Sequence, residues 1–128
     1  MGEEPVDART VYDLAGGEET FRRIVDRFYD GVGADPLLRP LYPPDLTESR
    51  RRLALFLIQY FGGPSTYSEE RGHPRLRLRH LPFPIGQAER DAWMRHMTAA
   101  VQAERLPAPI QALLLDYFDR ASTFLMNR

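Results

Sequence analysis

The sequence predicts a single all-helical domain, because apolar side chains recur at helical spacing in four segments and no comparable strand pattern interrupts them. Within each segment the apolar positions fall on one face of a helix. The four sets are Phe21, Ile24, Val25, Phe28 and Val32; Leu53, Phe56, Leu57 and Tyr60; Trp93, Met94, Met97, Ala100 and Val101; and Ile110, Leu113, Leu114, Tyr117, Phe118, Ala121, Phe124 and Leu125. We therefore expect about four substantial helices.

Turn and capping residues separate these helices. Gly16-Gly17 precedes the first helix, and Gly62-Gly63-Pro64 closes the second, which Thr47 is expected to cap. Asp35-Pro36 has the pattern of a cap followed by proline at the first helical position, which predicts a short helix there. Residues 64–85 contain four prolines and can hold only a short helix or loop. A long irregular segment of this kind usually carries function or is disordered.

Length and composition indicate one ordinary globular domain. The chain has 128 residues, 43% of them hydrophobic and 27% charged. We expect residues 1–10 to form a mobile tail and residues 11–128 to form the domain. The acidic N-terminus lacks the apolar segment of a secretory signal, and the longest apolar run, Leu53 to Ile58, is far too short to cross a membrane.

The residue types that are missing exclude several kinds of chemistry. The chain has no cysteine, which excludes disulfides, thiolate metal sites and haem attached through C-x-x-C-H, and which fits a cytoplasmic protein. The net charge is −1, so neither nucleic acid nor an anionic membrane is an expected partner.

His80 is the strongest candidate for a metal ligand, such as a ligand of haem iron. Pro82 prevents a regular helix from continuing beyond it, and its neighbours Leu76, Leu81 and Phe83 are apolar. A ligating imidazole must be neutral, with its other nitrogen donating to a group such as the Leu76 carbonyl. The pattern alone also fits a partly buried structural histidine. His73 and His96 are weaker candidates, in a polar turn and at a helix edge.

Tyrosine, tryptophan and arginine side chains form the second set of candidates. One side of an apolar pocket would carry hydrogen-bonding groups if Tyr29, Tyr42 and Trp93 converged there. The sequence fits equally well with three aromatic residues in unrelated parts of the core. The arginines that surround His80 form either a solvated face or guanidinium groups that hold carboxylates, such as haem propionates.

Taken together, seven short motifs between Val11 and Asn127 resemble group II of the truncated haemoglobins. They are Gly16-Gly17; Phe28-Tyr29; Pro36-x-Leu-x-x-x-Tyr42-Pro43; Gln59-Tyr60-Phe61-Gly62-Gly63-Pro64; Tyr67-Ser-Glu-Glu-Arg71-Gly-His-Pro-Arg-Leu76; Arg79-His80-x-Pro82-Phe83; and Arg90-Asp-Ala-Trp93. The resemblance implies a two-over-two helical sandwich around haem b, with a mostly irregular segment before the proximal histidine.

The resemblance also implies a role for individual residues. His80 matches the proximal ligand of the haem iron, and Tyr29, Tyr42 and Trp93 match the distal polar positions. Ser49 stands where other globins have a distal histidine, and Phe61 replaces a tryptophan common in close relatives. The implied pocket residues are Ser49, Leu53, Phe56, Leu57, Phe61, Leu76, Phe83 and Ile85. The implied propionate partners are Tyr67, Arg71 and Arg79.

The function expected from this resemblance is reversible binding of O2, or a related diatomic, by ferrous haem. The alternative is a haem redox enzyme that acts on NO or peroxide with electrons from an unidentified reductase. A third class, a helical interaction module without haem, would be a colourless protein. The sequence does not choose between binding and catalysis, and it leaves the oligomeric state open, with a homodimer as one alternative.

Overall fold

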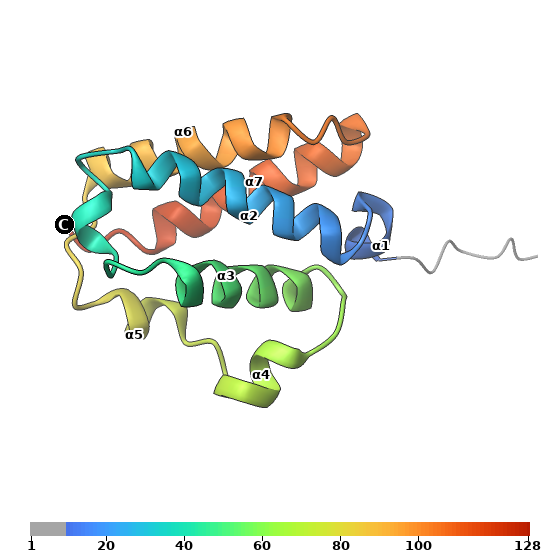
Figure 1. Ribbon diagram of the computed structural model, residues 1–128, viewed down its shortest axis with the longest axis horizontal. Coiled ribbons are helices and arrows are strands. Elements are labelled where there is room, and N and C mark those ends of the chain that lie inside the picture. Colours follow the sequence, from blue (N-terminus) through green and yellow to red (C-terminus); the bar gives the residue numbers. More distant parts are fainter. Residues whose placement is uncertain (1–9) are drawn as a thin grey trace, which may run out of the picture.

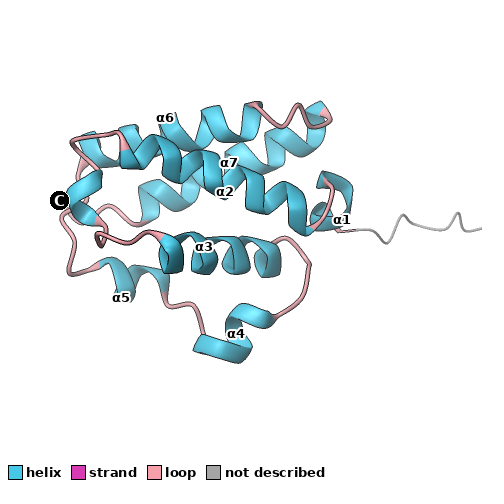
Figure 2. Ribbon diagram, viewed as in Figure 1, coloured by secondary structure: helices cyan, strands magenta, loops and turns pink. Residues whose placement is uncertain are grey.

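The computed structural model describes residues 10–128, in which helices are joined by loops and turns and there is no strand (Figures 1 and 2). Its elements are α1 (Val11–Ala15), α2 (Glu18–Gly33), the 3-10 helix η1 (Arg39–Leu41), α3 (Thr47–Tyr60), α4 (Thr66–Arg71), α5 (Leu76–His80), α6 (Gln87–Gln102) and α7 (Ala108–Phe124). The four long helices α2, α3, α6 and α7 coincide with the four apolar segments, so the predicted all-helical class is confirmed.

The long helices pack as two pairs. Helix α2 packs on α3 in one pair, α6 packs on α7 in the other, and α2 also packs against α6 to join them (Figure 1). The short helices α4 and α5 lie beyond α3, and the C-terminus returns to the end of the molecule where α5 leads into α6 (Figure 1). None of the helices in residues 10–128 is long and apolar enough to span a bilayer.

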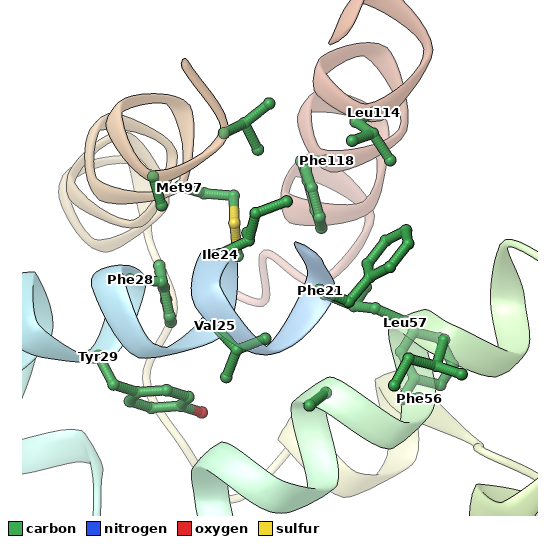
Figure 3. Packing of buried hydrophobic residues seen from close by; sticks show 14 of the residues in the cluster. Phe21, Ile24, Val25, Phe28, Tyr29, Phe56, Leu57, Met97, Leu114 and Phe118 are labelled. Atoms are coloured by element: carbon green, nitrogen blue, oxygen red, sulfur yellow. The ribbon is translucent and has the colours of Figure 1, made fainter. Parts of the chain in front are cut away.

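The core lies mainly on the buried face of α2. Phe21, Phe28 and Val32 are completely inaccessible to solvent, and Met97 of α6 and Leu114 of α7 are equally buried where they face α2 (Figure 3). Each fully buried side chain of this size stabilises the fold by about 1.5–3 kcal/mol. This packing holds α2, the helix that carries Tyr29, in a fixed position.

Several details differ from the sequence-based expectation. A short helix, α1, precedes Gly16-Gly17, and Thr10, which was assigned to the tail, caps it in a reciprocal pair of hydrogen bonds with Asp13. The rest of the predicted tail lies outside the described residues. Thr47 does not cap α3: it is the first helical residue, and its N–H donates to Oδ1 of Asp45 over 2.9 Å.

The expected short helix at Asp35-Pro36 begins later than predicted. The Asp35 carboxylate accepts the N–H of Leu37 over 2.9 Å, which makes a turn, and the 3-10 helix starts only at Arg39.

Residues 64–85 fold into two short helices joined by turns, as the four prolines predict. Gln59 at the end of α3 holds α4 through two hydrogen bonds to Ser68, one from its side-chain amide to the hydroxyl (2.7 Å) and one from the Ser68 N–H (2.9 Å). The Arg79 guanidinium donates to the carbonyl oxygens of Pro74 (2.7 Å) and Arg71 (3.3 Å). These bonds make the segment an ordered part of the domain.

One carboxylate connects α2 to the turn that follows α6. The side chain of Glu104 is only 4% exposed, and it accepts hydrogen bonds from the guanidinium groups of Arg23 (2.8 Å) and Arg27. These bonds, chiefly the one from Arg23, hold the pKa of Glu104 below its ordinary value of 4.5. The lowered pKa means that the stabilisation is present above the unfolded-state pKa and is lost as the pH falls through the folded-state pKa.

We predict that Glu104→Gln lowers the free energy of unfolding at pH 7 and makes that energy less dependent on pH below about pH 5. Urea denaturation from pH 3 to pH 7 measures both effects. The control is Glu19→Gln, because that carboxylate is 90% exposed and lies 4.0 Å from the same Arg23. An equal loss of stability in the two variants at every pH would show that Glu104 has no special role.

Candidate functional site

A largely apolar cavity lies between the helices, with about 870 Å³ of space not filled by atoms, including the part open to solvent at its mouth. It is lined by side chains from α2, α3, α5, α6 and α7 and from the connection between α2 and α3. A mostly apolar lining with a few polar groups is typical of a site for an apolar ligand. A few polar groups interrupt the apolar wall, and they include His80, Tyr29, Tyr42 and Trp93.

His80 is the last residue of α5 and the one imidazole in the cavity wall. Its Nδ1 lies 2.6 Å from the carbonyl oxygen of Leu76, one helical turn earlier. Because a carbonyl oxygen can only accept a hydrogen bond, Nδ1 must carry the proton. In the neutral imidazole the other nitrogen, Nε2, then keeps an unshared electron pair, which is the state that a metal ion requires.

The C-terminal end of the chain holds the loop that follows His80. The Asn127 side chain accepts the N–H of Ile85 over 2.9 Å and donates to the carbonyl oxygen of Phe83 over 2.8 Å. The backbone N–H of Asn127 also donates to the carbonyl oxygen of Ile85 over 2.9 Å. Since α5 has only five residues, these bonds supply much of what fixes the position of His80.

Three aromatic residues from different parts of the chain meet on the cavity wall. The rings of Tyr29 and Tyr42 are in edge contact, with centroids 5.5 Å apart. The ring of Phe28 connects Trp93 to Tyr29, because its centroid lies 5.0 Å from the centroid of each. Burial, reinforced by the neighbouring Tyr42, raises the pKa of Tyr29. Burial also raises the pKa of Tyr42 to about 12, and the indole N–H of Trp93 offsets part of that rise. Both hydroxyls therefore stay protonated at neutral pH and can donate hydrogen bonds.

The other predicted pocket residues divide into two groups. Leu53, Phe56, Leu57, Leu76 and Ile85 line the cavity. The remaining three are not among its lining residues. Ser49 is half-buried one turn before Leu53, Phe83 is 41% exposed, and Phe61 is buried beside a second, surface groove.

The predicted propionate partners lie around the proximal segment, and none of them is among the lining residues. Tyr67 is buried, with its ring in edge contact with Phe56 at a centroid distance of 5.5 Å. Two nitrogens of the Arg79 guanidinium donate hydrogen bonds to backbone carbonyl oxygens of the segment itself. Arg71 differs, because its Nε is one of two buried side-chain nitrogens in residues 10–128 without a hydrogen-bond partner.

Several lining residues were not predicted as part of the site. The helix α7 contributes Tyr117, Phe118 and Ala121, and Leu125 follows at its C-terminal cap; all four lie on the apolar face that the periodicity predicts. Periodicity alone does not place them in the site, because it does not distinguish a helix face that contacts a ligand from one that contacts another helix. Leu38, Leu41, Glu89, Arg90 and Ser122 also line the cavity. Leu38 and Arg90 lie within motifs that carry the family resemblance, and no local pattern in the sequence marks the other three.

Comparison with known proteins identifies the fold and its family. The family model described as bacterial-like globin matches residues 10–127. A group 2 truncated hemoglobin, YjbI of Bacillus subtilis (strain 168), is 44% identical over 112 residues, which are 88% of this chain and 85% of that protein. The chain belongs to the bacterial-like globin family.

Solved structures agree with this assignment. The hemoglobin of the thermophilic phototrophic bacterium Chloroflexus aurantiacus is 57% identical, with a TM-score of 0.92 and coverage of 94% of this chain and 99% of that one. The truncated oxygen-avid haemoglobin of Bacillus subtilis is 43% identical, with a TM-score of 0.88 and coverage of 93% and 100%. The resemblance to group II truncated haemoglobins is thereby confirmed. Membership of the globin family implies haem binding and binding of a diatomic ligand.

The anchoring of the His80 loop gives a prediction that needs no ligand. Asn127→Ala removes the acceptor for the Ile85 N–H, so the exchange of that amide hydrogen should become about 10- to 150-fold faster, as the loss of about 1.4–3 kcal/mol of local stability requires. NMR-detected hydrogen exchange measures it. Asn127→Asp is the matched control, because it keeps an acceptor and should change the rate less. An unchanged rate in Asn127→Ala would show that Asn127 does not anchor the loop.

Proposed function

We propose that the chain binds haem b in this cavity, with Nε2 of His80 as the proximal ligand of the iron, and that it binds O2 reversibly. The observation that carries the proposal is the 2.6 Å contact between Nδ1 of His80 and the Leu76 carbonyl oxygen, because it leaves Nε2 as the free donor of an imidazole in the cavity wall. The oxygen-avid Bacillus subtilis relative supports O2 as the ligand, in preference to redox turnover of NO or peroxide.

The residues present fit a flat, largely apolar macrocycle. Leu53 and Phe56 of α3 form one part of the wall, and Leu76 and Ile85 flank His80 on another. The absence of cysteine excludes attachment through C-x-x-C-H, which favours haem b held without a covalent link to the protein.

The distal residues would control how long a ligand stays. Ferrous haem would supply reversible binding of diatomic gases, and an O2 ligand with partial negative charge would accept hydrogen bonds from the protein. The indole N–H of Trp93 and the hydroxyls of Tyr29 and Tyr42 are donors on the same cavity wall. A hydrogen bond to a charged acceptor is worth about 1.5–3 kcal/mol, which slows escape about 10- to 150-fold. Slow release of this kind suits sensing or chemistry better than bulk delivery.

The proximal arginines differ in what they can contribute to propionate binding. Arg71 keeps a buried Nε without a partner, so it has donor capacity that a carboxylate would use. Arg79 has its Nε and one terminal nitrogen engaged with backbone carbonyls. We therefore infer that Arg71, with Tyr67 beside it on α4, is the more direct propionate partner, and that Arg79 acts mainly by ordering the segment.

We predict that His80→Ala largely abolishes haem retention, because no other imidazole lines the cavity among residues 10–128. Haem reconstitution followed by Soret absorbance measures this. His73→Ala is the control and should retain haem, since His73 is exposed in the turn before α5. Retention of the full Soret band by the His80 variant would reject the assignment.

Trp93→Phe tests the distal donors, because it keeps an aromatic ring and removes the N–H. The O2 dissociation rate should rise by about 10- to 100-fold, as the loss of a hydrogen bond to a polar ligand requires. The CO dissociation rate should change much less, because bound CO is less polar. A wider pocket alone would instead speed the entry of both gases alike. Stopped-flow rates for both gases measure these effects, and an unchanged O2 dissociation rate would remove Trp93 from the mechanism.

A further inference from the structure

The three distal donors are not equally well fixed by the main core. Tyr29 belongs to the long helix α2, and Trp93 belongs to the long helix α6. Tyr42 belongs to the connection between α2 and α3, where it follows the three-residue helix η1. A three-residue helix has little stability of its own. The position of the Tyr42 hydroxyl therefore depends on what holds this connection against the rest of the protein.

Residues 35–44 form one hydrogen-bonded unit. The N–H of Arg39 donates to the carbonyl oxygen of Asp35 over 2.8 Å, and the N–H of Tyr42 donates to that of Arg39 over 3.2 Å. The Arg39 guanidinium then closes the unit, because it donates to the carbonyl oxygens of Tyr42 (3.3 Å), Pro43 (2.9 Å) and Pro44 (2.7 Å). A displacement of Asp35 at one end of this unit is thus transmitted to Tyr42.

Asp35 is anchored to α6 by His96. Its Oδ2 lies 2.6 Å from Nε2 of His96, and the two side chains are only 9% and 20% exposed. The same carboxylate accepts the Leu37 N–H through Oδ1, so it joins the turn to α6 directly. The bond to His96 is the main reason that the pKa of Asp35 lies below its ordinary value. The carboxylate is therefore ionised at neutral pH.

The same imidazole also fits closely against α2. A Cβ atom at Gly31 would lie 2.5 Å from Nδ1 of His96, so the ring occupies space that only glycine leaves free. His96 lies three residues after Trp93 on α6, close to one helical turn. It thus stands where α2, α6 and the 35–44 unit meet, and these three elements carry Tyr29, Trp93 and Tyr42.

We propose that His96 is a positioning residue for the distal site: through Asp35 it fixes the 35–44 unit, and hence the Tyr42 hydroxyl, relative to Trp93. The proposal rests on the proposed haem function and deepens it. Arg95 contacts the same carboxylate at 3.4 Å, but its side chain is 68% exposed and contributes little to the anchor.

The test compares His96→Phe, which keeps a ring and removes the donor, with His96→Gln, whose amide nitrogen can replace Nε2. The C–O stretching frequency of the CO complex and the O2 dissociation rate are measured on haem-loaded protein. His96→Phe should shift and broaden the C–O band and raise the O2 dissociation rate about 2- to 10-fold, as expected for one weakened hydrogen bond. In His96→Gln the C–O band and the O2 dissociation rate should lie closer to their wild-type values than in His96→Phe. In Arg95→Gln neither the band nor the rate should change.

A double-mutant cycle separates positioning from a general loss of stability. Asp35→Asn keeps an acceptor for Leu37 and weakens the bond to His96. If the two residues act through one contact, the double variant His96→Phe/Asp35→Asn changes the O2 dissociation rate no more than the larger single effect. Independent, additive effects, or an unaltered C–O band in His96→Phe with normal haem content, would overturn the proposal. Failure of the wild-type chain to bind haem would instead reject the proposed function.

Discussion

The proposed function depends on the hydrogen bond between His80 and the carbonyl oxygen of Leu76. This bond places the proton on Nδ1 and leaves Nε2 as the donor for a metal. The bond closes one turn of the five-residue helix α5, which is too short to be stable alone. Arg79 orders the segment through the carbonyl oxygens of Pro74 and Arg71, and Asn127 ties the loop after His80 to the C-terminal end of the chain. The geometry of the imidazole therefore depends on one neighbouring and one distant residue.

The rest of the fold positions the three polar aromatic residues that line the same cavity as His80. The buried side chains of α2, among them Phe21 and Phe28, fix this helix, which carries Tyr29. Helix α6 packs against α2 and carries Trp93. Tyr42 completes the set from a connecting segment held by its own hydrogen bonds and by Asp35. In a domain of this size the same few buried contacts therefore supply both stability and the arrangement of donors.

The sequence predicts the long helices well because their apolar periodicity is a local signal. Pro82 and the apolar neighbours mark His80 only as a candidate, because the same pattern fits a structural histidine. The sequence does not predict the roles of Asn127 or of His96, since each depends on contacts with residues more than 40 positions away. Whether Tyr29, Tyr42 and Trp93 converge was also undecided by pattern alone. Helix α1 was missed, although Thr10 and Asp13 have the spacing of a capping box.

The central claim is that this chain holds one haem in the cavity and binds O2 through it. Absorption spectroscopy of the full chain, titrated with haem and then examined with and without reductant and O2, tests the claim most directly. We expect uptake of one haem per chain and, after reduction, a spectrum that changes on adding O2 and returns when O2 is removed. A chain that stays colourless, or whose reduced spectrum does not respond to O2, would contradict it.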